Sequence, residues 1–163
     1  MGAMPLPNWR IALHERAFAA LNALALRRGR DAQPVHLRTG ERGEDAVFFY
    51  LLRKGYVVVA RRWSAGNLRG DVDLIAWQGD LLCFLEVKSR TARDETPAEA
   101  AVDRHKRYVL RRLARTYLRQ LPGRLPPQVR FDVISVYLLP GKEPEVIHFE
   151  NSFGWNEWRE IAT

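Results

Sequence analysis

Charged side chains interrupt two apolar stretches of the sequence, DLIAW at 73–77 and LLCFLEV at 81–87. They are Asp71, Asp73, Glu86 and Lys88. An unpaired charge inside a protein core costs on the order of several kcal/mol, so these positions need an explanation. Carboxylates beside an ammonium group can hold a divalent cation and assist the hydrolysis of a phosphodiester. The residues therefore have the types that a metal-dependent hydrolysis needs.

The turn between the two stretches decides whether the carboxylates meet. Side chains alternate between the two faces of a strand, and a hairpin with the two-residue loop Gly79-Asp80 places Asp73 opposite Glu86. A three-residue loop would instead pair Asp73 with Leu85 and turn Glu86 to the other face. Glycine in the first loop position favours the two-residue turn, so we predict that Asp73 lies opposite Glu86.

Opposed carboxylates, whose Cβ atoms lie ~5 Å apart, repel each other. Asp73 and Glu86 would then need either a shared proton or a cation. An all-oxygen set without His or Cys suits Mg²⁺ or Mn²⁺ rather than zinc, and Lys88 lies on the same face as Glu86, within reach of whatever the metal holds. The alternative interpretation is that Glu86 and Lys88 form an exposed ion pair worth ~0–1 kcal/mol.

The hydrophobic patterns predict the elements that position these residues. We expect helices at 8–28, 40–54 and 98–121, and strands at 56–63, 71–77, 81–88, 129–139 and 145–150. Gly55 is placed to end the second helix, and a capping box at Thr96–Glu99 to begin the third. This order predicts a mixed α/β domain at 40–154, with a helical extension and linker at 1–39 and a tail at 155–163.

The composition is that of one globular domain with a polyanionic partner. The 163 residues are 47% hydrophobic, and 26 basic against 19 acidic residues give a net charge of +7. Such a basic balance favours nucleic acid first and an acidic membrane second. The single cysteine, Cys83, excludes an internal disulfide and suits a reducing compartment. No apolar run approaches the ~20 residues of a membrane span, so we expect a cytoplasmic protein.

Several short motifs together give the chain a family resemblance. They are GERGEDA at 40–46, RGDVDLIA at 69–76, FLEVKSR at 84–90, Lys106, and RFDVI at 130–134. An Asp on one strand followed by Glu-x-Lys on the next resembles the PD-(D/E)XK nuclease superfamily. The motifs together resemble the YraN family of bacterial proteins of uncharacterised function. They span about residues 40–154, and the N-terminal 38 residues lie outside the resemblance.

The resemblance implies a restriction-endonuclease-like fold, which is a mixed central sheet flanked by helices, here with an extra N-terminal helix. It is similar to the fold of the archaeal Holliday-junction resolvases. By position, Asp73 and Glu86 would be metal ligands and Lys88 the catalytic lysine, with Mg²⁺ or Mn²⁺ as cofactor. Glu44 would be the helix carboxylate that joins the metal site. The alternative for Glu44 is a first-turn acid that stabilises the helix dipole by under ~1 kcal/mol.

Two other acids are set apart from this site. The chain has Gly70-Asp71 where the family usually has Gly-Glu, which argues against a direct role for Asp71. Asp132 lies on a later strand, and we expect it to accept hydrogen bonds from helix or loop donors rather than to bind metal.

The helix at 98–121 is the predicted nucleic-acid surface. The residues expected to contact nucleic acid are Arg104, Lys106, Arg107, Arg111 and Arg115. The four arginines recur every three or four residues and would form a ridge for phosphates, which Arg61, Arg62 and Arg69 would extend. A solvated helix face is the alternative. The sequence has no base-reading motif, so we expect recognition of backbone and shape.

The sequence therefore predicts a Mg²⁺- or Mn²⁺-dependent endonuclease that hydrolyses phosphodiester bonds of DNA, with branched or damaged DNA among the candidate substrates. RNA as substrate stays open. The alternative is a non-catalytic nucleic-acid-binding or scaffolding module that keeps the nuclease fold and recruits partners through the helix at 8–28. We expect no membrane partner, and a homodimer stays an open alternative.

Overall fold

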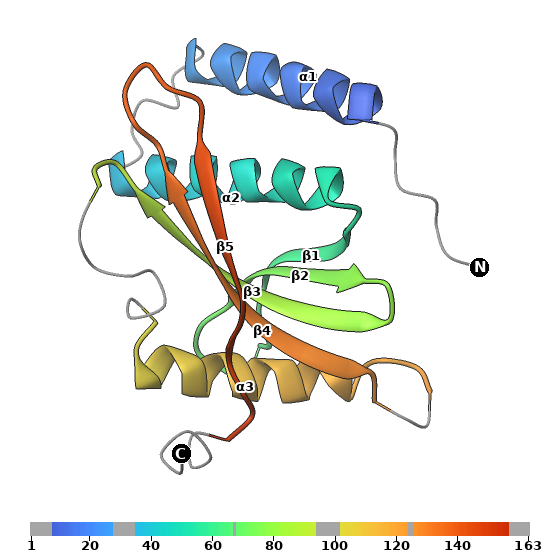
Figure 1. Cartoon of the computed structure of the whole chain (residues 1–163). Coiled ribbons are helices and arrows are strands. Elements are labelled where there is room, and N and C mark those ends of the chain that lie inside the picture. The colour runs from blue at the N-terminus through green and yellow to red at the C-terminus, as the bar shows by residue number, and fades with distance from the viewer. Residues whose placement is uncertain (1–7, 28–34, 67, 94–101, 124–125, 157–163) are drawn as a thin grey trace.

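A five-stranded sheet lies between helices (Figure 1). The computed structural model describes residues 8–27, 35–66, 68–93, 102–123 and 126–156. The elements are α1 (Asn8–Arg27), α2 (Val35–Arg53), β1 (Val57–Trp63), β2 (Val72–Gln78), β3 (Leu81–Arg90), α3 (Arg104–Leu118), β4 (Gln128–Tyr137) and β5 (Glu145–Phe153). The predicted element order is confirmed.

The sheet is mixed, with strand order β1-β2-β3-β4-β5. Neighbouring strands are antiparallel except for β3 and β4, which run parallel. A parallel pair needs a long crossover connection, and α3 lies in the connection between these two strands. The predicted class, a restriction-endonuclease-like mixed sheet flanked by helices with an extra N-terminal helix, is confirmed.

The central strands are buried on both faces. Phe84 and Phe131 pack with Leu113 of α3 on one face, whereas Leu74 and Leu85 pack with Leu51 of α2 on the other. Covering both faces explains why most residues of β2, β3 and β4 are apolar.

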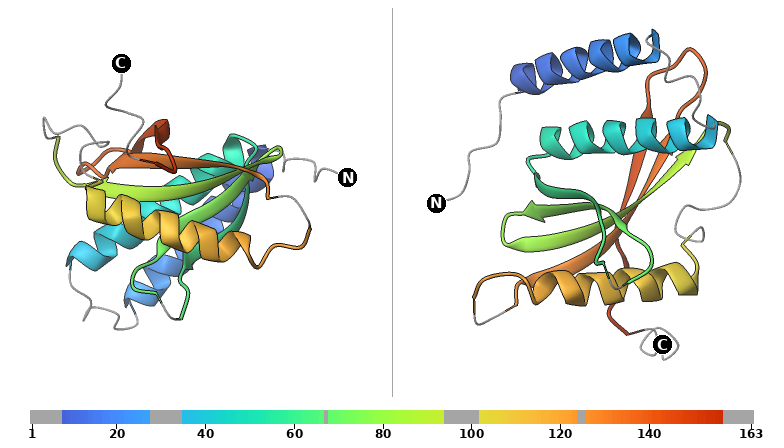
Figure 2. Two further views of the ribbon diagram at one scale, coloured as in Figure 1. Left: turned by 90° about the horizontal axis from the view of Figure 1, so that it is seen from below. Right: turned by 180° about the vertical axis from the view of Figure 1, so that it is seen from behind.

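The extra helix α1 lies on the outer side of α2, away from the sheet (Figures 1 and 2). Ile11 is fully buried, and Glu15 Oε2 lies 2.6 Å from Arg53 Nη1 of α2. In the described part of the chain, no helix combines the length and the apolar composition that a membrane crossing requires.

Two helices begin at residues other than those predicted, and α3 also ends at Leu118 rather than at residue 121. α2 begins at Val35, before the predicted start at Gly40, and α3 begins at Arg104, after the predicted start at residue 98. Glycines at 40 and 43 disfavour a helix locally, but the packing of α2 on the sheet outweighs them. The capping box predicted at 96–99 lies outside the described residues. Asp103 is the N-cap instead and accepts a hydrogen bond from the backbone N–H of Lys106.

The predicted end of α2 is confirmed. Gly55 adopts φ +82°, in the left-handed region that glycine occupies without strain. Its backbone N–H donates to the Leu52 carbonyl at 3.0 Å, and the N–H of Tyr56 donates to the Leu51 carbonyl at 3.0 Å. These bonds close the last helical turn and turn the chain into β1.

Candidate active site

Strands β2 and β3 form the hairpin that the sequence predicts. Gln78 pairs with Leu81 across a two-residue loop, and Gly79 adopts φ +58°. The register continues as far as the pair Leu74–Leu85. It follows that Asp73 and Glu86 are the next residues in the same register, as predicted.

Regular strand pairing ends one step before the two carboxylates. Beyond the last pair, Asp73 Oδ2 accepts a hydrogen bond from the backbone N–H of Val87 at 2.6 Å. A side chain of β2 thus replaces a backbone acceptor at the point where the two strands part.

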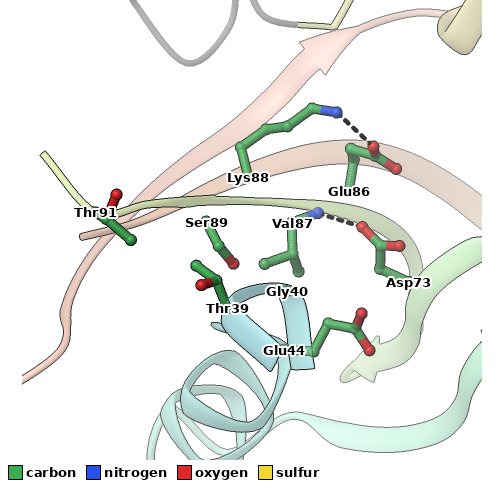
Figure 3. Close-up of a pocket in the computed structure, with 9 residues that line it drawn as sticks. All are labelled: Thr39, Gly40, Glu44, Asp73, Glu86, Val87, Lys88, Ser89 and Thr91. Carbon is green, nitrogen blue, oxygen red and sulfur yellow. Dashed lines mark hydrogen bonds and ion pairs between the residues drawn. The ribbon is translucent and has the colours of Figure 1, made fainter. Parts of the chain in front are cut away.

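A pocket of about 640 Å³ lies at this parting of the strands (Figure 3). Its lining residues are Thr39, Gly40, Glu44, Asp73, Glu86, Val87, Lys88, Ser89 and Thr91. Figure 3 shows Glu86 and Lys88 on the side of β3 away from α2, with the Asp73 carboxylate between Glu86 and the Glu44 side chain that projects from α2. The four residues that the resemblance assigns to the site are therefore gathered in one pocket.

Glu86 is the most deeply buried carboxylate of the pocket, with 3% of the residue exposed. Two lysines neutralise it. Lys88 Nζ donates to Oε1 at 2.9 Å, and Lys106 Nζ lies 2.9 Å from Oε2. The two ammonium groups offset the loss of hydration that burial imposes on this carboxylate.

Lys106 contacts a pocket acid, although it is not itself among the residues that line the pocket. From the first turn of α3 its ammonium reaches Glu86 and donates to the Asp71 carbonyl oxygen at 3.3 Å. Burial lowers the pKa of Lys106, but the negative charge of Glu86 and the hydrogen bond to it outweigh this effect and hold the pKa above its usual value. The sequence motif marks Lys106, but its partner depends on how α3 crosses the sheet, which no local pattern encodes.

The carboxyl group of Asp73 has a pKa far above its usual value. Burial and the nearby charge of Glu86 raise the pKa of Asp73 to about 7, although the Val87 N–H and Lys106 act in the opposite direction. Like charges at one site and desolvation both favour the protonated form. In the absence of a further cation, the pKa of Asp73 therefore lies close to neutral pH.

Glu44 is held at the pocket wall by an arginine from β1. Arg62 Nε donates to Glu44 Oε2 at 2.7 Å, and its Nη1 donates to Glu41 at 3.3 Å. Arg62 adopts φ +48°, which is unfavourable for a residue with a side chain and is found where the surroundings enforce it. Because α2 begins at Val35, Glu44 lies beyond the first helical turn, and the interpretation as a dipole-stabilising first-turn acid is wrong.

The residues of the pocket fit a hard divalent cation. All candidate ligands are carboxylate oxygens, and burial, followed by the charge of Glu86, raises the pKa of Asp73. The described residues contain no group of three or more His, Cys, Asp or Glu side chains arranged to hold a metal. Mg²⁺ often takes one or two protein carboxylates and completes its shell with water and substrate phosphate, so Asp73 and Glu86 meet that need.

The arginines of the predicted ridge fall into two groups, exposed side chains and side chains that contact the protein. Arg104 and Arg115 are exposed, but Arg111 is only 6% exposed and donates from Nε to the Gly154 carbonyl at 2.7 Å. The guanidinium groups of Arg107 and Arg111 lie 5.6 and 5.4 Å from the centre of the Phe153 ring. The predicted continuous phosphate ridge is therefore not formed, because Arg107 and Arg111 fasten the end of β5 to α3.

The arginines expected to extend that surface also have protein partners. Besides the contacts of Arg62, Arg61 forms an ion pair with Asp45 of α2. Both guanidinium groups therefore link β1 to α2. Arg69 is exposed.

Asp132 is confirmed as a hydrogen-bond acceptor away from the pocket, although its donors come from strands. The carboxylate is fully buried. Arg130 Nε and Nη2 each donate to it at 2.8 Å, and the Asn151 N–H donates at 2.9 Å. His148 Nε2 lies 2.8 Å from Oδ2. Although burial raises the pKa of Asp132, the bonds from His148 and Arg130 lower it below its usual value.

The fold and the pocket define a restriction-endonuclease-like α/β protein with an acid–lysine cluster where two strands part. The chain belongs to the uncharacterised protein family UPF0102, whose sequence pattern matches residues 43–136. This family assignment confirms the resemblance to the YraN family.

Relatives in several bacteria support the assignment. The chain is 47% identical over 121 residues to a UPF0102 protein of Koribacter versatilis, covering 74% of this chain and 82% of that protein. It is 37% identical over 118 residues to a UPF0102 protein of Rhodococcus jostii, covering 72% and 98%. Each relative bears the family name alone, so the comparisons assign a family and not an activity.

Proposed function

We propose that this protein is a divalent-metal-dependent endonuclease that hydrolyses phosphodiester bonds of DNA. One observation carries the proposal: Asp73 and Glu86 line one pocket beside Lys88 at the point where β2 and β3 part. The basic balance of the chain supports a polyanionic substrate. A cytoplasmic location agrees with the single buried thiol, Cys83.

Each polar residue of the pocket has a task in this proposal. Asp73 and Glu86 hold Mg²⁺ or Mn²⁺, and Glu44 acts directly or through water. The ion, when bound, lowers the pKa of a water and neutralises phosphate charge. Lys88, on the same strand as Glu86, orients the attacking water or stabilises the charge that develops on the phosphate. Lys106 is a positioning residue, because it holds the Glu86 carboxylate from the opposite element.

Cleavage of defined substrates tests the proposal. The purified protein is incubated with junction, flap, single-stranded and duplex DNA in the presence of Mn²⁺. We expect cleavage of at least one substrate, and a loss of at least about 100-fold in rate for Asp73→Ala and for Lys88→Ala. Lys54→Ala, which removes an exposed lysine just after α2, is the matched control and should cleave normally.

Metal binding tests the site independently of turnover. Calorimetric titration with Mn²⁺ should show binding to the wild type and weaker binding to Asp73→Asn. Equal binding to both proteins would show that the metal site is elsewhere. Folded protein that cleaves none of the substrates would contradict the enzymatic proposal.

One observation favours a second candidate, a non-catalytic nucleic-acid-binding or scaffolding module. Lys88 and Lys106 already neutralise Glu86 without a metal ion, so the pocket does not need metal to bury that charge. This candidate predicts binding to nucleic acid that falls with salt but is indifferent to EDTA and to Asp73→Ala, with no cleavage.

A further inference from the structure

The outward side of α3 carries a row of exposed side chains. They are Arg104, Tyr108, Arg112, Arg115 and Arg119, which we call the α3 stripe. Their spacings of three and four residues place them on one side of the helix and its final turn. The opposite side, with Leu110, Leu113 and Ala114, packs on the sheet. Figure 2 shows α3 lying across the sheet, so its outer side faces solvent.

The charge of the α3 stripe is uncompensated. The sequence of α3 contains no Asp or Glu, and within the described part of the chain no carboxylate pairs with Arg104, Arg112 or Arg119. These three arginines differ from Arg107 and Arg111, whose guanidinium groups pack on Phe153. Within the α3 stripe, the Arg115 guanidinium lies 5.4 Å from the centre of the Trp155 ring. A row of unpaired guanidinium groups is suited to bind consecutive phosphates.

Tyr108 gives the α3 stripe an aromatic centre. It is 53% exposed, and the Arg112 guanidinium lies 5.6 Å from the centre of its ring. A ring with a neighbouring guanidinium is a flat cationic platform on which a nucleic-acid base can stack. The bases of an intact duplex already stack on each other, so such a platform fits an unpaired base.

The α3 stripe begins at the end of α3 from which Lys106 reaches the pocket acid Glu86. Arg104 and Tyr108 lie two residues before and after Lys106, and residues two apart do not share a side of a helix, so the α3 stripe runs along the side of these turns away from Lys106. The 15 residues of α3 extend for roughly 22 Å, enough to follow a few nucleotides of a single strand. A strand bound along this row would therefore lead to or from the acid–lysine cluster.

We infer that the α3 stripe binds a single-stranded segment of DNA, with Tyr108 stacking on an unpaired base and Arg104 and Arg112 contacting the flanking phosphates. The identity of the nucleic acid as DNA rests on the proposed function, but binding at the α3 stripe requires no metal. The preferred substrates then carry an unpaired strand next to the phosphate that is cleaved.

Fluorescence anisotropy of the full chain in EDTA tests this inference without cleavage. The probes are a labelled oligothymidine of about 16 nucleotides and a blunt duplex of the same length. We expect the wild type to prefer the single strand and Tyr108→Ala to bind it about 5- to 100-fold more weakly. Tyr108→Phe should retain the affinity, because the ring still stacks. Arg104→Gln should lower the slope of log K against log salt by about 0.7.

The control for lost positive charge is Lys142→Gln, in the exposed connection between β4 and β5, at the end of the molecule opposite α3 (Figure 1). Wild-type preference for the duplex, or unchanged single-strand affinity of Tyr108→Ala, would overturn the inference. The result is separable from the nuclease proposal. Cleavage that needs Asp73 but not Tyr108 would support the nuclease proposal and contradict binding at the α3 stripe. Binding of the single strand that depends on Tyr108, without any cleavage, would support the α3 stripe and contradict the nuclease proposal.

Discussion

At the residue scale, Asp73 is an acid of the pocket whose pKa is raised by burial and by the charge of Glu86. Its carboxylate has one backbone donor, the Val87 N–H, and shares its surroundings with Glu86. Two lysines contact acids of the pocket, Lys88 and Lys106, and both form ion pairs with Glu86. The two carboxylates therefore differ: Glu86 is neutralised by the protein, whereas Asp73 has to take a proton or an added cation.

The raised pKa of Asp73 predicts how stability depends on pH. A carboxyl group that titrates near 7 in the folded protein and near 3.8 in the unfolded chain stabilises the fold at low pH. That contribution is lost as the pH rises from about 4 to about 7. Asp73→Asn does not titrate, so we expect it to be more stable than the metal-free wild type at about pH 8, by at least about 2–4 °C in Tm.

Thermal denaturation in EDTA at about pH 5 and about pH 8 measures this difference. Asp80→Asn in the exposed hairpin turn controls for the loss of one negative charge. If the Tm of Asp73→Asn exceeded that of the wild type by the same amount at both pH values, the raised pKa of Asp73 would be contradicted. Added Mn²⁺ at the higher pH should stabilise the wild type more than the variant.

Among the elements, the contact between α2 and β3 sets the shape of the pocket. Gly43 of α2 faces Ser89 of β3, and a Cβ atom at Gly43 would lie 1.8 Å from Ser89 Oγ and 2.9 Å from Ser89 Cβ. Rotation of the serine could move Oγ, but Cβ is fixed to the strand backbone. The absence of a side chain at this position lets the helix approach closely enough for Glu44 to reach the pocket.

Gly43→Ala should therefore destabilise the protein by about 1–3 kcal/mol and weaken Mn²⁺ binding, because α2 must move away from β3. Gly40→Ala on the same helix is the matched control. A Cβ at Gly40 meets nothing within 4 Å, and alanine favours a helix by up to ~1 kcal/mol, so this variant should be equally or more stable.

Urea denaturation measures the free energies of unfolding of Gly43→Ala and Gly40→Ala. The double variant Gly43→Ala/Ser89→Gly should recover part of the loss, because the clashing side chain is removed. Equal stability of the two alanine variants would show that the close approach is unimportant.

At the scale of the whole molecule, two polar clusters are separate. The pocket holds acids that lack full compensation, whereas the cluster around Asp132 is satisfied by Arg130, His148 and the Asn151 backbone. Tyr56 extends this second cluster, since Arg130 Nη2 donates to its hydroxyl at 2.9 Å. The Asp132 cluster therefore joins β4 and β5 to the connection between α2 and β1, and we expect it to stabilise the fold.

Asp132→Ala should cost about 3–5 kcal/mol of unfolding free energy, because it leaves Arg130 and His148 buried without their acceptor. Asp132→Asn, which keeps the shape of the side chain, should lower the free energy of unfolding by less. It replaces the alanine variant in the measurement if that variant does not fold. Urea denaturation compares these variants with Glu145→Ala, which breaks the exposed ion pair with Arg93 and should cost ~0–1 kcal/mol. A similar loss for Asp132→Ala and Glu145→Ala would contradict the proposed role.

Local chemistry was enough to predict the hairpin and most of the elements. Alternating faces and a glycine in a two-residue turn act between neighbours in the chain, so the register of Asp73 and Glu86 followed from residues 70–90 and is confirmed by the pairing of Gln78 with Leu81. The same locality explains the correct end of α2 at Gly55. The predicted start of α2 was wrong, because the helix continues through Gly40 back to Val35, although glycine locally disfavours a helix.

The partners of the charged side chains depended on contacts between distant elements. Spacing along α3 suggested one basic ridge, but the way α3 lies on the sheet sends Lys106 to Glu86 and Arg111 to Gly154, and leaves Tyr108 and Arg112 outside. The direction of a helical side chain is a property of its helix, whereas the surface that it meets belongs to strands far away in sequence. Residue types and short spacings thus determined which groups are available, and the crossing of α3 over the sheet assigned each group to the pocket, the core or the solvent.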